Sequence, residues 1–164
     1  MPTISSVIQC GLTVRKTITT GADNANNPIV SLSVGGQTSL NDTSTTPDVE
    51  KGACPQIALV AGAKTIDLTA VPDLNGGTVD GTGKKPRALF FGNPSTNAGN
   101  ITFAVGASNG SDGIAGSWSI TLRPGEDVTI KIADTGPSAV SGTKKNIDVT
   151  GTGTEQFDFG VIFG

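Results

Sequence analysis

Hydrophobic residues alternate with polar ones along most of this chain, in short stretches separated by turn residues. The clearest stretches are residues 101–105, 118–122, 128–132 and 157–163, and Pro124-Gly125 predicts a type II turn that joins two of these strands in a hairpin. A period of two is typical of a strand with one buried face, whereas a helix repeats every 3.6 residues. About nine such strands predict an all-β fold, an antiparallel β-sandwich. We expect a jelly-roll-like strand order, with an immunoglobulin-like order as the alternative.

The composition of the chain is that of a folded protein. Its 164 residues are 35% hydrophobic and 15% charged, which is too apolar and too weakly charged for a disordered chain. A chain of about 150 residues buries about 70% of the surface that it exposes when unfolded, so a core is available. We expect a single β-sandwich domain over residues 1–164. A short polar arm over residues 1–6 and a long polar loop over residues 37–55, after Gly35-Gly36 has ended a strand, complete the predicted organisation.

Several function classes are excluded or disfavoured by composition. The chain has no His, which removes Ser-His-Asp and Cys-His catalysis and the commonest ligand of catalytic zinc and copper. A net charge of −3 argues against a nucleic-acid partner. The N-terminus lacks a basic start followed by an apolar run, and the longest apolar stretch is far short of the ~18 residues of a membrane span. We expect no enzymatic activity, no cofactor, no membrane partner, and synthesis in the cytoplasm.

The two cysteines, Cys10 and Cys54, are expected to be free and buried. A disulfide between them is the alternative. Their spacing does not decide between these states, because a disulfide requires Cα atoms within about 7 Å.

Two groups of acidic residues are candidates for a functional site, one for calcium binding and one for catalysis. Asp73, Asn75 and Asp80 place side-chain oxygens near glycines, as calcium loops do, but the sequence has Lys84 where an EF-hand loop has its bidentate Glu. The alternative is that these residues form tight turns through local hydrogen bonds.

Asp42, Asp48 and Glu50 carry carboxylates of the kind that glycoside hydrolysis requires. Nothing in the sequence brings them together. Trp118 is the natural stacking platform for a sugar, but it is in phase with Ile120 and Leu122 and is predicted to be a core residue. A hydrolase is therefore disfavoured.

The segment around Phe90-Phe91 is the candidate interface. Residues 88–92 form a nearly continuous apolar run, which is typical of a central strand that is covered on both faces or lies at an interface. Adjacent residues of a strand point to opposite faces, so a partner is expected to cover one of the two phenylalanines. Lys84, Lys85 and Arg87, just before this run, are either solvated charges or a docking site for an acidic partner surface.

Several segments resemble the small β-sandwich virion proteins of tailed bacteriophages and their prophage relatives. The resemblance is carried by residues 63–72, Gly81-Thr-Gly83, 87–93, 118–125 and 146–153 and by the closing apolar strand, which together span residues 63–163, about 60% of the chain. It implies a structural protein without enzymatic activity that assembles as a homo-oligomer. Such proteins decorate or cement capsids, in contact with the major capsid protein, or build tail and head-tail rings.

The resemblance therefore predicts a capsid decoration or cement protein located in the virion, with a tail or other capsid component as the second placement. A carbohydrate-binding module or adhesin domain is the competing class, because it uses the same scaffold with loops that contact sugars. The two classes differ in association: a cement protein self-associates and binds a shell, whereas a binding module is monomeric and responds to a sugar.

Overall fold

The computed structural model describes residues 5–17, 29–41, 50–73, 76–133 and 135–164, and these residues form strands, turns and loops without a helix. The strands are β1 (Ser5–Thr17), β2 (Ile29–Asn41), β3 (Lys51–Ala53), β4 (Gln56–Ala58), β5 (Ala63–Asp67), β6 (Val71–Pro72), β7 (Thr78–Val79), β8 (Pro86–Gly92), β9 (Ile101–Val105), β10 (Ser119–Leu122), β11 (Asp127–Lys131), β12 (Asn146–Thr150) and β13 (Gln156–Phe163).

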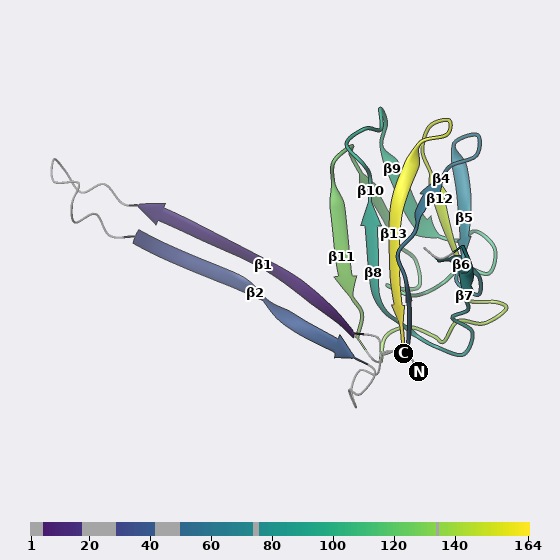
Figure 1. Cartoon of the computed structure of the whole chain (residues 1–164), viewed down its shortest axis with the longest axis horizontal. Coiled ribbons are helices and arrows are strands. Elements are labelled where there is room, and N and C mark those ends of the chain that lie inside the picture. Colours follow the sequence, from purple (N-terminus) through teal and green to yellow (C-terminus); the bar gives the residue numbers. More distant parts are fainter. Residues whose placement is uncertain (1–4, 18–28, 42–49, 74–75, 134) are drawn as a thin grey trace.

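Two antiparallel sheets form the body of the molecule. Sheet I has the order β10-β9-β12-β5, and sheet II has the order β11-β8-β13-β3, with β4 also paired to β13. The sheets lie as two layers, with β8 and β13 in the nearer layer of Figure 1 and β9 and β12 behind them. The predicted all-β sandwich is confirmed. Short β6 and β7 pair with each other beside the sandwich.

The strands of the sandwich pair as a nested series. β13 pairs with β3 and β4, β12 with β5, β11 with β8, and β10 with β9, so the chain forms a long antiparallel hairpin that is folded over into two sheets. Contacts of β13 with β8 and of β12 with β9 then join the pairs within each sheet.

The core lies between the two sheets and is built by the alternating residues. Five phenylalanines have less than 2% of their surface exposed, and three of them lie on β13, which makes this strand the main contributor of core volume. The ring of Phe103 in sheet I lies 4.7 Å from that of Phe91 and 5.6 Å from that of Phe157, both in sheet II. The buried hydrophobic cluster comprises Ala53, Ile57, Leu59, Ile66, Leu68, Val71, Leu89, Phe91, Ile101, Phe103, Leu122, Ile132, Val140, Ile147, Val149, Phe157, Phe159, Val161 and Phe163.

The turn at Pro124-Gly125 has the predicted backbone conformation but joins different elements from those expected. Gly125 has a φ of +84°, and the Glu126 N–H donates to the Arg123 carbonyl over 3.0 Å, as a type II turn requires. The flanking strands β10 and β11 belong to sheets I and II and do not pair. The prediction of a hairpin is therefore wrong, and the turn carries the chain from one sheet to the other.

A long two-stranded ribbon precedes the sandwich. β1 and β2 pair over their whole lengths, from Ser5 opposite Asn41 to Thr17 opposite Ile29. Figure 1 shows this ribbon extending away from the sandwich, with its near end close to β11.

The ribbon corrects two boundaries predicted from the sequence. Gly35-Gly36 does not end a strand, because both residues pair with β1 and β2 continues to Asn41. Glycine weakens a strand but adopts extended backbone angles freely, so cross-strand pairing carries the strand through. Of the predicted loop over residues 37–55, residues 37–41 belong to β2 and residues 51–53 form β3, whereas residues 42–49 lie outside the described part of the chain. The predicted arm over residues 1–6 likewise overlaps β1 at Ser5 and Ser6.

Candidate functional site

The two adjacent phenylalanines of β8 lie on opposite faces of sheet II, as predicted. Phe91 is fully buried in the core, with ring centroids 5.7 Å from Trp118 and 5.9 Å from Phe159. The Phe91 ring therefore belongs to the core, and of the two phenylalanines Phe90 is the one that faces outward. Phe90 lies on the outer face of sheet II and is half-buried. The strand itself is central, as its apolar run predicted, since it lies between β11 and β13.

Small residues surround Phe90 on that outer face. A Cβ built on Gly160 would lie 3.0 Å from the Cβ of Phe90, and one built on Gly92 would lie 3.3 Å from two atoms of the Phe90 ring. The ring therefore lies against the backbone of the neighbouring strand positions. Ala88, which is 4% exposed, pairs with half-buried Ile162 in the next row across the sheet. We call these five residues the Phe90 patch.

The outer face of sheet I has the opposite character. Thr102 and Thr121 lie opposite each other and share a hydrogen bond of 2.9 Å between their hydroxyls. Thr65 donates to the carboxylate of Asp148 over 2.7 Å across the β5–β12 pair. A sheet face that remains in water carries polar residues, as sheet I does. On sheet II apolar side chains form only the centre of the outer face, because exposed Asp127, Thr129 and Lys131 lie on the neighbouring strand β11.

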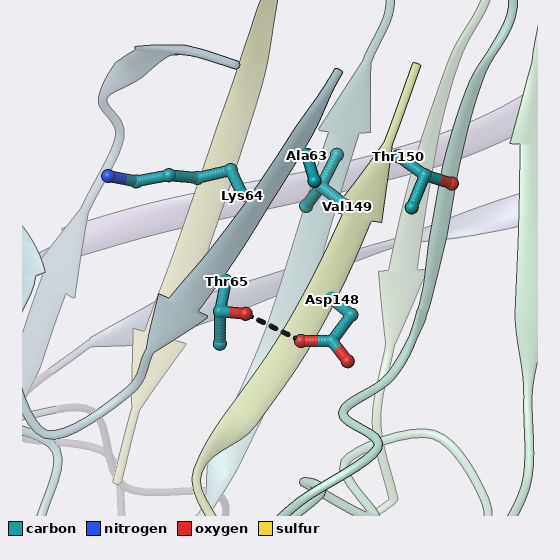
Figure 2. A pocket seen from close by; sticks show the side chains of 6 residues that line it. All are labelled: Ala63, Lys64, Thr65, Asp148, Val149 and Thr150. Carbon is teal, nitrogen blue, oxygen red and sulfur yellow. Dashed lines mark hydrogen bonds between the residues drawn. The ribbon is translucent and has the colours of Figure 1, made fainter. Parts of the chain in front are cut away.

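A pocket on sheet I lies beside this polar row. Ala63, Lys64, Thr65, Asp148, Val149 and Thr150 line it, and Figure 2 shows the Lys64 side chain extending away from Asp148. Both carboxylate oxygens of Asp148 accept hydrogen bonds, one from Thr65 and the other from the Ala107 N–H over 2.8 Å. In this arrangement Asp148 ties the loop after β9 to the edge strand β5.

The basic residues Lys84, Lys85 and Arg87 do not form one exposed cluster. Arg87 is only 9% exposed, because it is in phase with Leu89 and Phe91 on the inward face of β8. Lys84 forms an ion pair with Glu50. The backbone N–H and C=O of Lys85 bond to Gly164 over 3.0 Å each. These residues tie the strand to its neighbours inside one subunit.

The acidic candidates are placed separately by the fold. Glu50 is engaged with Lys84, and Asp42 and Asp48 lie outside the described residues. The structure therefore does not bring the three carboxylates together within the part of the chain that it describes.

The calcium candidates Asp73 and Asp80 lie in turns around β6 and β7. The Asp73 N–H donates to the Gly77 carbonyl over 2.9 Å, and the carboxylate of Asp80 accepts the Thr82 N–H over 2.8 Å. This hydrogen bonding from Thr82 holds the pKa of Asp80 below its usual value. Asn75 lies outside the described residues, and among those described no three His, Cys, Asp or Glu side chains gather as metal ligands. The hydrogen bond from Thr82 to Asp80 is the local bond of a tight turn, which was the alternative to a calcium site.

The remaining candidates are one cysteine and the tryptophan. Cys54 is free, but it is exposed, so its predicted burial is wrong. It lies in the link between β3 and β4, and its sulfur lies 3.7 Å from a Cβ built on Gly160 of β13. Trp118 is half-buried with its ring against Phe91, and its indole N–H donates to the Ser111 carbonyl over 3.3 Å. Its apolar face thus extends the core, as predicted.

An ion pair at the edge of sheet I makes stability depend on pH. Partial burial raises the pKa of Asp67, but hydrogen bonds from Lys145 (2.6 Å) and Thr69 outweigh it and leave the pKa below its ordinary value. A lowered pKa stabilises the fold above about pH 4, and this stabilisation is lost as the pH falls through the folded-state value. We expect the urea midpoint to fall between pH 7 and pH 2.5, and Asp67→Asn to show a smaller fall. An equal fall in both proteins would contradict this role of Asp67.

Comparisons with known proteins found no relative of this chain: no family model, curated protein or solved structure matches it. Among the described residues, no helix is long and apolar enough to cross a membrane.

Proposed function

We propose that this chain is a structural virion protein of a tailed bacteriophage, a capsid decoration or cement protein that self-associates and stabilises the shell. The observation that carries the proposal is the Phe90 patch. The outer face of sheet I is polar, whereas the half-buried apolar side chains of Phe90 and Ile162 lie at the centre of the outer face of sheet II, where a neighbouring subunit would cover them. The resemblance of the chain to phage virion sandwiches supplies the kind of assembly.

The fold suits this role for physical reasons. A shell component requires rigidity and a surface for neighbours, and the nested strand pairing fixes both sheets around a single buried cluster. Homo-oligomers with closed symmetry bury such a surface without leaving a free copy of it. The side chains that the structure places as candidates for chemistry are engaged within the subunit: Asp148 with Thr65, Glu50 with Lys84, and Asp80 with Thr82.

The placement in a particle can be tested directly. Phage particles from an induced lysate of the strain that carries this gene should contain the chain in many copies, and immunogold label against it should lie on the heads. Particles from a strain in which the gene is deleted should release DNA at a lower temperature than intact particles. Label on the tail would support the second placement, and purified particles that lack the chain would contradict a virion function.

The carbohydrate-binding alternative is not supported by a feature of the described site. Trp118, the residue that a sugar would stack on, has its ring against Phe91 and its N–H bonded to Ser111. A change in the thermal midpoint on addition of a glycan would return this class to consideration.

A further inference from the structure

We propose that two copies of this chain pair through β11, the edge strand of sheet II, in an antiparallel arrangement with a two-fold axis at Thr129. The two copies of sheet II then form one continuous sheet. The proposal rests on the proposed function only in requiring self-association, and it names the strand and the register through which the copies meet.

β11 is an open edge of its sheet. It is the last strand in the order β11-β8-β13-β3, so β8 pairs with one of its two sides. The near end of the ribbon lies close to β11 in Figure 1, but among the described residues β1 pairs with β2 and not with β11. An edge strand presents a row of backbone N–H and C=O groups to which another strand can be added.

Hydrogen bonds at the two ends of the β8–β11 pairing show which residues direct their backbone to the open side. The Asn93 N–H donates to the Glu126 carbonyl over 2.9 Å. The Ile132 N–H donates to the Arg87 carbonyl over the same distance. Because the direction of hydrogen bonding alternates along an antiparallel strand, the even-numbered residues of β11 face β8. The odd-numbered residues direct their N–H and C=O groups to the open side, and Thr129 is the middle one.

The charges of β11 match in this register. When Thr129 of one copy lies opposite Thr129 of the other, each Asp127 lies opposite a Lys131. All three side chains are exposed on the outer face of the sheet. Opposite charges across a strand pair stabilise it, and like charges destabilise it. A parallel pairing in register would place Asp127 opposite Asp127, so the charges favour the antiparallel arrangement about Thr129.

The inward face of β11 gains from the same pairing. Val128 and Ile130 pack against the core cluster but are only half-buried. Their partners on β8, Phe91 and Leu89, have at most 1% of their surface exposed. In the proposed register Val128 of one copy lies opposite Ile130 of the other, on the inward side of the joined sheet. The second copy therefore removes from water the apolar surface that the edge of the sandwich leaves half-exposed.

The other edges of the sandwich are less suited to pairing. Sheet II ends on its other side in β3 and β4, two strands of three residues with Cys54-Pro55 between them. Sheet I ends in β10, which has four residues, and in β5, where Lys64 is exposed. Short strands, proline and lysine protect an edge from pairing. β11 has five residues, and its one lysine has Asp127 of the second copy opposite it.

The first test reverses the charges of β11 in the full chain, with dimerisation measured by sedimentation velocity over a range of concentrations. Asp127→Lys places a lysine opposite Lys131, and Lys131→Asp places an aspartate opposite Asp127. Each variant alone should therefore dimerise about tenfold more weakly than the wild type. In an equimolar mixture of the two variants every charge again lies opposite its complement, so a heterodimer should form with an affinity close to that of the wild type.

The second test blocks the pairing without a change of charge. Thr129→Pro removes an N–H on the open side of β11, where an edge strand tolerates proline. Thr121→Pro is the matched control on β10, the edge strand of sheet I. The Val105 N–H donates to the Trp118 carbonyl over 3.2 Å, so by the same alternation the Thr121 N–H points to the open side of β10. Circular dichroism and a cooperative thermal transition show that each variant is folded.

We expect the wild type and Thr121→Pro to pass from 16.4 kDa to twice that mass as the concentration rises, and folded Thr129→Pro to keep the mass of one chain. Charge variants that dimerise as tightly as the wild type, or whose mixture associates no better than each alone, would overturn this inference and leave self-association intact. A wild type that is monomeric at every concentration would overturn both, whereas the position of the chain in the particle is tested separately by the immunogold label.

Discussion

Replacing Phe91 by alanine should lower the free energy of unfolding by about 3–5 kcal/mol, as for other fully buried aromatic side chains. The Phe91 ring has no exposed surface and lies between Phe103 of sheet I and Phe159 of sheet II. Its removal leaves a cavity at the centre of the sandwich, where the surrounding rings are held by strands on both sides. Urea denaturation followed by circular dichroism measures the effect as a lower midpoint at an unchanged slope.

The neighbouring residue, Phe90, provides a matched control because it has the same side chain. Phe90→Ala removes an identical side chain from the outer face of the same strand, where it is half-buried. We expect it to cost less than half as much, measured at a protein concentration where the chain is monomeric. Equal losses for the two variants would contradict the division of this pair between core and surface.

Replacing Gly110 by alanine should also have a large effect. A Cβ at this position would lie 2.4 Å from the carbonyl oxygen of Gly106 and 2.6 Å from a methyl group of Val105. The close contact is with backbone, so the loop must move to accept it. Overpacking of this kind costs about 1–3 kcal/mol and sometimes more, and we expect the upper end of that range.

Gly116→Ala is the matched control for this prediction, because a Cβ there meets nothing within 4 Å in the same loop. Thermal denaturation should show a midpoint lowered by several degrees for Gly110→Ala and one close to wild type for Gly116→Ala. Similar midpoints for the two variants would mean that the loop does not hold its backbone as closely as the structure shows.

The alternation of hydrophobic and polar residues predicted those features of the fold that depend on a single strand. The alternation of Phe157, Phe159 and Phe163 predicted an inward face for β13, and the same alternation divides Phe90 from Phe91. The period of two also shows why Arg87 is buried, since it occupies an inward position of β8. There the charge of the residue suggested a surface site, whereas the phase of the strand decides its position.

Pairing between distant segments could not be predicted in the same way. The ion pair of Lys84 with Glu50 joins residues 34 positions apart, and it depends on sheet II being formed. The strand through Gly35-Gly36 depends on β1 as its partner, and the sheet change at Pro124-Gly125 depends on which strands lie beside β10 and β11. In each case the local sequence predicts the backbone conformation. The choice of the partner strand depends on contacts between residues that lie far apart in the sequence.

The nested pairing also sets the order in which the sandwich can form during synthesis. β13 lies at the centre of sheet II, where it pairs with β8 on one side and with β3 and β4 on the other, yet residues 156–163 leave the ribosome after all the other strands. Until then, β3 and β8 present unpaired edges to other chains. Folds dominated by such distant pairings fold in milliseconds to seconds, so the nascent chain waits for its last strand before sheet II can close.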